Sequence, residues 1–217
     1  MNKKRTSELP YDRNAELTKE FNTFWSEWQN KNGQLTRDIP LSSLKNVVLL
    51  KSALHNINNI ATLKTTELLV DKLVKFFPVR FKAVEKDIRN KIRNESPNAN
   101  GYDIQFESDT VSFVAEIKCN IPFQQDKQGN WKFGANQTNG IKKDIENLKF
   151  GKSKADLKKG KKYYKFLGIY DYEKRSGSAM AQILESDRVK KCTPIMHLRK
   201  DVTLMPEVIY VVMLGSD

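Results

Sequence analysis

Two short stretches in the middle of the chain alternate between apolar and polar residues. In the first, Tyr102, Ile104 and Phe106 alternate with Asp103 and Gln105. A second alternation runs from residue 111 to residue 118. A period of two is typical of β-strands, and the short polar segment between the stretches predicts a tight turn. The pattern therefore predicts a β-hairpin.

The same alternation predicts how the two strands pair. A turn at Ser108-Asp109 places Phe106 opposite Val111 and Ile104 opposite Phe113. The two apolar sets then share one face, because successive side chains of a strand point to opposite sides. A loop with an odd number of residues would separate the two sets, so we expect an even number.

Two carboxylates and one ammonium group fall on the other face of this hairpin. With this pairing Asp103 faces Val114 and lies diagonal to Glu116, roughly 7 Å away between backbones. Lys118 follows two residues later on the same face. We therefore expect these three charged side chains to converge, with the opposite face of the hairpin in the core.

The apolar pattern predicts further elements on both sides of the hairpin. Helices are expected over 15–30, 41–58, 65–77, 138–149 and 178–190, and strands over 163–170 and 208–214, whereas 79–93 fits a charged helix or a strand. Pro78 should end the third helix, and Gly151 should end the fourth, which Thr138 or Asn139 would cap. This order of elements predicts an α/β fold.

Two carboxylates on one face suit a divalent cation. Magnesium is usually held by one or two carboxylates and keeps several waters or phosphate oxygens as its other ligands. Such an ion polarises a phosphodiester and acidifies a bound water. A lysine beside it, here Lys118, would orient that water or stabilise the negative charge that develops on the phosphate.

These residues resemble the motif of the PD-(D/E)XK nuclease superfamily, which includes most type II restriction endonucleases. Asp103 matches the first acid, Glu116 the second and Lys118 the lysine, while Tyr102 stands where the family often has proline. The motif covers about twenty residues. An acid followed by Glu-x-Lys also occurs by chance, so a surface hairpin with a solvated Glu–Lys pair is the alternative.

The resemblance implies a restriction-endonuclease-like core, in which helices flank a mixed central β-sheet and the active site lies at one sheet edge. We expect this core over 61–217, with a helical N-terminal region over 1–60 as part of the same compact unit. It also implies a Mg²⁺-dependent, sequence-specific endonuclease of double-stranded DNA, of the type II restriction class. A structure-selective repair or junction nuclease, or a non-catalytic nucleic-acid-binding protein, are the alternatives.

Composition agrees with a polyanionic partner. The 217 residues include 38 Lys and Arg against 26 Asp and Glu, a net charge of +12, and such an excess favours nucleic acid.

Two cysteines, Cys119 and Cys192, form neither a disulfide framework nor a zinc site. With no signal peptide and no apolar run of about 18 residues, we expect a cytoplasmic protein without a membrane partner.

Two polar segments are candidates for DNA contact. The segment 123–140 holds seven Asn or Gln residues, and its amides suit adenine edges. The segment 149–165 holds eight lysines and one acid, and it suits phosphates. The DNA-contact candidates are Gln124, Gln125, Asn136, Gln137, Lys158, Lys159, Lys161, Lys162 and Arg175. Solvated polar loops are the alternative for both segments.

Three further expectations complete the sequence-based picture. Arg175, in the segment 171–178, would read a guanine edge, or else this segment is a simple surface turn. Glu67 is a possible extra acid near the metal, although a solvent-facing helix glutamate is the simpler interpretation. A homodimer on a palindromic site is expected, because one hairpin supplies one metal site and the duplex has two strands. The aromatic helix at 15–30 is the expected dimer surface, or else it packs the core.

Overall fold

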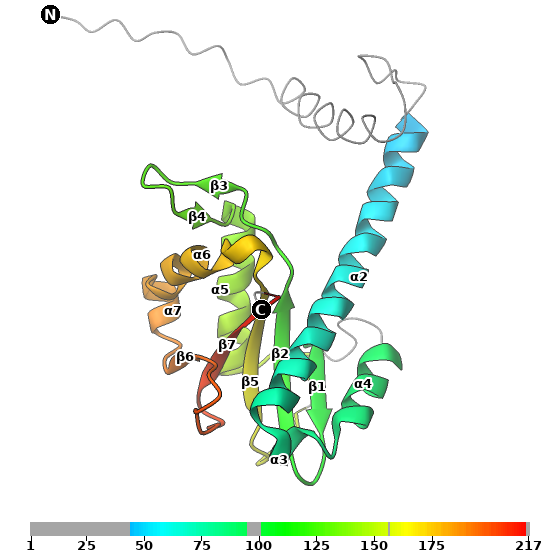
Figure 1. Ribbon diagram of the computed structural model, residues 1–217, viewed down its shortest axis with the longest axis vertical. Coiled ribbons are helices and arrows are strands. Elements are labelled where there is room, and N and C mark those ends of the chain that lie inside the picture. Colours follow the sequence, from blue (N-terminus) through cyan, green and yellow to red (C-terminus); the bar gives the residue numbers. More distant parts are fainter. Residues whose placement is uncertain (1–43, 95–100, 156, 216–217) are drawn as a thin grey trace, which may run out of the picture. The chain divides into compact units, whose positions relative to one another are not determined.

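The computed structural model describes residues 44–94, 101–155 and 157–215 (Figure 1). The chain divides into two compact units, Met1–Leu54 and His55–Asp217; apart from residues 44–54, where the first described helix begins, the features below belong to the second. The helix expected at 15–30 lies outside the described residues. The division into a helical region over 1–60 and a nuclease core over 61–217 stays a prediction.

A five-stranded mixed sheet forms the centre of the second unit, in the order β1-β2-β5-β7-β6 (Figure 1). Strand β1 is antiparallel to β2, whereas β2, β5, β7 and β6 are mutually parallel neighbours. The strands span Ile104–Glu107 (β1), Ser112–Lys118 (β2), Tyr164–Tyr170 (β5), Ile195–His197 (β6) and Ile209–Leu214 (β7). Gln124–Gln125 (β3) and Trp131–Lys132 (β4) pair as a separate small hairpin.

Helices cover both faces of the central sheet. Their bounds are Leu44–Phe76 (α2), Pro78–Phe81 (α3), Glu85–Asn94 (α4), Ala135–Phe150 (α5), Ser176–Leu184 (α6) and Asp187–Lys190 (α7), with a 3₁₀ turn at Tyr172–Lys174. The first three pack in one apolar cluster with one face of the sheet, and the last three pack in a second cluster with the other face (Figure 1). The predicted α/β class, with a mixed sheet flanked by helices, is therefore confirmed.

An aromatic cluster fills the layer between the sheet and α3. The ring centroid of Phe113 lies 5.8 Å from that of Phe81, 5.8 Å from that of Phe106 and 5.9 Å from that of Phe166. The pairs with Phe81 and Phe166 are edge-to-face, and such pairs contribute about 0.5–1.5 kcal/mol each beyond their buried area. Since Phe106 and Phe113 come from the two hairpin strands, this cluster anchors the hairpin that carries the candidate site.

Helix α5 connects the parallel strands β2 and β5, a connection that requires a crossover. Ile141, Ile145 and Leu148 form its buried stripe. The helix begins at Ala135, about one turn before the predicted start. The predicted N-caps Thr138 and Asn139 are therefore wrong.

The N-cap of α5 is instead Gly134, whose N–H donates to Gln137 Oε1 at 3.1 Å. At the other end, the N–H of Gly151 donates to the carbonyl of Asn147 at 2.8 Å, so the predicted stop at Gly151 is confirmed. The helix therefore starts earlier than predicted, at a cap formed by Gly134 and Gln137, while its buried apolar face is the predicted one.

Other elements differ from the prediction, or settle an alternative that it left open. The helices expected over 41–58 and 65–77 form one continuous helix, α2, since no proline or glycine interrupts them. The ambiguous 79–93 is helical, as α3 and α4. The short strands β3, β4 and β6 were not predicted, because two or three residues are too few to show a period.

Candidate functional site

The hairpin forms as predicted, but its register differs from the prediction by two residues. Phe106 pairs with Phe113 and Ile104 with Ala115, so the predicted partners Val111 and Phe113 are wrong. The turn is longer than expected: Ser108 N–H donates to the carbonyl of Val111 at 2.9 Å, and the Ser108 hydroxyl bonds there as well. Because a shift of two preserves the faces, the predicted sharing of faces is confirmed.

This register brings the two acids closer than predicted. Continued by one residue beyond the pair Ile104–Ala115, it sets Asp103 directly opposite Glu116 instead of diagonal to it. Asp103 Oδ2 accepts a 2.7 Å hydrogen bond from the N–H of Ile117, which holds this carboxylate against β2. Gly101, with a φ of 83°, supplies the left-handed turn immediately before these residues.

Glu116 is buried and contacts a lysine that the sequence did not single out for this role. Its residue is 2% exposed, and Oε1 lies 2.5 Å from Lys152 Nζ, just beyond the end of α5. This contact lacks hydrogen-bond geometry at Oε1. Lys152 also donates to the carbonyl of Gly101 and lies 5.1 Å from the ring centroid of Tyr102. The second acid therefore has a cationic neighbour that is tied to the start of the hairpin.

Lys118 contacts a third carboxylate, on α5. Its Nζ lies 2.6 Å from Asp144 Oδ2, and the Asp144 side chain is 12% exposed. The prediction that only the opposite face is core is wrong, because α5 covers this face too: β2 is buried along its length until Lys118. Five charged groups, Asp103, Glu116, Asp144, Lys118 and Lys152, thus form one cluster between β2 and α5; we call it the carboxylate cluster.

Burial and like charges perturb the acids of the carboxylate cluster. Burial, together with the negative charges of Asp103 and Asp144, raises the pKa of Glu116 to about 8, although Lys152 acts in the opposite direction. Burial also raises the pKa of Asp103, against the hydrogen bond from Ile117. Strongly shifted pKa values in a cluster of this kind are typical of functional sites, and of buried ion-pair networks too.

The neighbouring charges also shift the pKa of Lys118. Burial lowers the pKa of Lys118, but the Asp144 contact and the charges of Asp103 and Glu116 outweigh it, and the net shift is upward. Lys118 is therefore a protonated ammonium group at neutral pH. It can donate a proton or stabilise a negative charge, but it cannot serve there as a base.

The raised pKa of Glu116 predicts a pH dependence of stability. Since this pKa is about 8 in the folded chain and 4.5 in an ordinary glutamate, the folded state binds an extra proton between these values. The free energy of unfolding should therefore fall as pH rises from about 5 to 8. Urea titrations across this range should show a smaller fall for Glu116→Gln than for the wild type. Equal slopes would contradict the raised pKa.

The fit of a magnesium ion can be tested against the same residues. Among the described residues, no three His, Cys, Asp or Glu side chains form a group that could hold a metal. Asp103 and Glu116 provide two carboxylates that repel each other, and Glu116 Oε1 is a buried acceptor without a hydrogen bond. A site with two protein ligands, completed by water and phosphate oxygens, suits these residues.

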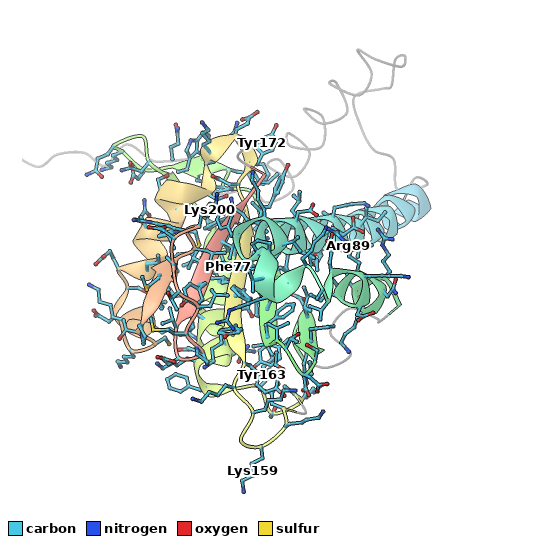
Figure 2. All side chains as sticks on the ribbon, turned by 60° about the horizontal axis from the view of Figure 1, so that its bottom comes forward. Phe77, Arg89, Lys159, Tyr163, Tyr172 and Lys200 are labelled. Atoms are coloured by element: carbon cyan, nitrogen blue, oxygen red, sulfur yellow. The ribbon has the colours of Figure 1, made fainter. Side chains whose placement is uncertain are left out.

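The lysine candidates lie at the turn of the hairpin, away from Asp103. Lys158 Nζ is 3.0 Å from Glu107 Oε2 at the end of β1, and Lys161 donates to the carbonyl of Ser108 at 3.1 Å. Lys159 and Lys162 are exposed, and Figure 2 shows Lys159 projecting from the tip of its segment. Only Lys152, in the same lysine-rich segment, reaches the carboxylate cluster among the contacts described.

The amide and arginine candidates lie together near the other end of the sheet. Gln124 and Gln125 are exposed in β3, Asn136 is exposed in the first turn of α5, and Gln137 caps that helix. The Arg175 guanidinium lies 4.3 Å from the Trp131 ring centroid. The segments 123–140 and 171–178 therefore meet.

Arg175 already has several partners on this surface. It pairs with Glu173 and lies 5.3 Å from the ring centroid of Tyr172 as well as over Trp131. Ser178, in the next helix, donates to the carbonyl of Trp131 at 3.5 Å. A guanine-reading role for Arg175 stays a prediction, and it would require the side chain to leave these contacts.

The ion-pair partners of Glu67 do not belong to the carboxylate cluster. It pairs with Lys64 at 2.8 Å and with Arg93 at 3.1 Å, on the helices that pack against the other face of the sheet. The Lys64 hydrogen bond is the largest influence on its pKa, which is lowered. Its role as an extra metal-binding acid stays a prediction; the side chain is only 16% exposed and ion-paired, so it does not face solvent as the simpler interpretation expected.

Asp144 and Lys152 are the site residues that sequence reasoning missed. A signal existed for Asp144: it lies between the buried Ile141 and Ile145, at a helix position where a charge needs a partner. Lys152 was included in the lysine-rich segment, but nothing in the sequence separates it from its neighbours.

No family model, curated protein or solved structure matches the chain. Among the described helices, none has the length and apolar character needed to span a membrane. The evidence for function therefore rests on the residues and their geometry.

Proposed function

We propose that this protein is a magnesium-dependent endonuclease that hydrolyses phosphodiester bonds of double-stranded DNA. The observation that carries the proposal is the register of the hairpin. Continued one residue past its last pair, Ile104–Ala115, this register sets Asp103 opposite Glu116, with Lys118 on the same face of β2, and all three interact electrostatically. An acid pair with an adjacent ammonium group is a chemically sufficient set for metal-assisted phosphodiester hydrolysis.

In this proposal each residue of the set has a defined role. Asp103 and Glu116 hold Mg²⁺, which would supply Lewis acidity and a more acidic water. The Ile117 N–H keeps the Asp103 carboxylate oriented. The Lys118 ammonium stabilises negative charge on the phosphate, as donors in other hydrolytic sites do. Asp144 is a positioning residue, because its 2.6 Å contact fixes where this ammonium lies.

The positive charge of the chain supports a nucleic-acid substrate. The net charge is +12, and phosphate contacts from lysines supply most of the non-specific affinity for DNA. The adjoining segments 123–140 and 171–178 present exposed amides beside Arg175. We assign base reading to this surface and backbone contact to the lysine-rich segment.

Sequence specificity is the finer part of the proposal. A type II restriction enzyme acting as a homodimer on a palindrome is the form we favour, and a structure-selective repair or junction nuclease is its alternative. Digestion of plasmid DNA with magnesium tests both. Discrete bands indicate a restriction enzyme, whereas a smear indicates a nuclease without sequence preference.

One observation favours a different function, a nucleic-acid-binding protein without catalysis. Glu116 is only 2% exposed, and the acids of the carboxylate cluster already contact protein cations or an N–H group. Buried ion-pair networks of this kind also occur as purely structural features. DNA binding without cleavage in the same plasmid digest would identify this function.

The lysine-rich segment should control the salt dependence of DNA binding. Each phosphate contact contributes about 0.9 to the slope of log affinity against log salt. Neutralising four lysines together should therefore flatten the slope for all DNA sequences alike; the four are Lys158, Lys159, Lys161 and Lys162. Fluorescence anisotropy titrations at several salt concentrations measure this slope.

A control for this prediction replaces exposed lysines outside the segment. Lys86→Gln with Lys200→Gln removes two positive charges outside the segment. The salt slope of this variant should be closer to that of the wild type than the slope of the four-lysine variant is. A slope unaltered by the four substitutions would mean that the segment faces solvent in the complex too.

A further inference from the structure

A cavity of about 450 Å³ lies beyond the C-terminal end of α5, beside the start of β5. Its volume is within the range of small-molecule binding sites. Four ammonium groups and one carboxylate are among its lining residues: Lys149, Lys161, Lys162, Lys165 and Glu207. Its charge is therefore strongly positive, which is unusual for a cavity that serves packing alone.

Lys165 occupies a position where the fold alone would favour an apolar residue. It pairs with Val114 in register and shares its face of β5 with Leu167 and Ile169, which pack under α5. Burial, with the nearby charge of Lys149, lowers the pKa of Lys165. Partial burial of a charged ammonium group at this position costs folding free energy unless an anion compensates the charge.

The neighbours of Lys165 provide little compensation. Its hydrogen bond to the carbonyl of Lys149 is 3.4 Å long, which is weak, and among the described ion pairs none includes it. Lys149 donates to the carbonyl of Thr193 at 2.6 Å. Lys161 donates to the carbonyl of Ser108, with Glu107 Oε2 3.9 Å away. The ammonium groups are thus held mainly by neutral carbonyls, which leaves their charge available.

The cavity is adjacent to the carboxylate cluster but distinct from it. Tyr102 lines the cavity, and its ring also receives Lys152 from the cluster. Neither Asp103, Glu116 nor Lys118 belongs to the cavity lining. An anion bound there would therefore neighbour the proposed metal site without being held by its acids.

We propose that this cavity is a phosphate-binding site, with Lys165 at its base and Lys149, Lys161 and Lys162 around it. Four lysines in the lining of one pocket suit a phosphate group, which accepts charge-assisted hydrogen bonds from lysine. The phosphate belongs either to a nucleic-acid strand or to a small phosphorylated molecule. The proposal concerns binding only and stands whether or not the carboxylate cluster cleaves DNA.

Isothermal titration calorimetry of the full chain tests the site, with inorganic phosphate, pyrophosphate and a 20-base-pair duplex as separate probes. Lys165→Met keeps the length of the side chain and removes its charge. The expected loss of affinity is about tenfold or more for whichever probe occupies the site, as for one charge-assisted hydrogen bond. Lys162→Gln, at an exposed position, should act in the same direction and guards against misfolding of the first variant.

Lys86→Met is the matched control, because Lys86 is exposed on α4, which packs with the other face of the sheet. Phosphate or pyrophosphate binding that only the cavity variants weaken identifies a small phosphorylated ligand. Duplex binding that only they weaken, without binding of the free anions, identifies a strand phosphate. Cavity variants that match Lys86→Met with every probe would overturn the proposal.

Discussion

Replacing Glu116 by glutamine, or Asp103 by asparagine, is expected to abolish cleavage while DNA binding remains largely intact. Each change removes one of two carboxylates that face each other across the hairpin. Since two ligands hold the ion in our proposal, the loss of either removes Lewis acidity and water activation together. Single-turnover cleavage and anisotropy binding, measured on the same preparations, separate the two effects.

The structural cost of these variants is a necessary control. Above about pH 8, where the Glu116 carboxyl is ionised, removing one member of this buried ion pair leaves its partner uncompensated, which destabilises proteins by about 3–5 kcal/mol. The Lys152 side chain is 18% exposed, so it can turn toward water when Glu116 becomes neutral. Glu116→Gln with Lys152→Met removes both charges and should fold while remaining inactive. Substantial cleavage by a folded single variant would contradict the assignment of that acid.

Lys118→Ala is expected to lower the cleavage rate by roughly 10²-fold or more, the usual effect of losing one donor to a developing negative charge. Metal affinity should change little, because Asp103 and Glu116 remain. Single-turnover rates at saturating magnesium measure the first effect, and calorimetric magnesium titration measures the second.

Asp144→Asn provides a test of the positioning of Lys118. It keeps the ammonium group but removes the charge that lies 2.6 Å from it. We expect a smaller loss of rate than in Lys118→Ala, with an altered pH profile, because Asp144 raises the pKa of Lys118. Unchanged single-turnover cleavage in Lys118→Ala would show that this lysine is structural.

The hairpin could be predicted from the sequence because two neighbouring short stretches both keep a period of two. Apolar residues at 104, 106, 113, 115 and 117 fixed the shared face whatever the length of the turn. The register could not be predicted, since pairings that differ by two residues give the same faces. The Ser108 side chain stabilises the observed turn, because its hydroxyl donates to the Val111 carbonyl and accepts from the Val111 N–H.

The acids and lysine of the motif were within reach of sequence reasoning, but their surroundings were not. Periodicity places Glu116 on the face opposite Ala115, yet it does not reveal that α5 covers that face. The pairing of Lys118 with Asp144 joins residues 26 positions apart. Contacts of this range depend on how the crossover helix packs, and no local pattern encodes them.

The cavity lysines illustrate the same limit. The sequence shows eight lysines between residues 149 and 165 but does not distinguish them. The structure separates Lys158, which pairs with Glu107, from Lys165, which lies half-buried under the end of α5. Lys165 is more buried than Lys158 because, of the eight lysines, only Lys165 lies in a strand of the central sheet.

Cleavage of an end-labelled DNA duplex, with magnesium and with EDTA, tests the central proposal most directly. The wild-type chain and Glu116→Gln, purified in the same way, should be compared in parallel. We expect cleavage only by the wild type and only with magnesium, because both carboxylates are needed to hold the ion. Equal cleavage by both proteins, or DNA binding by the wild type without any magnesium-dependent cleavage, would contradict a nuclease site at Asp103 and Glu116.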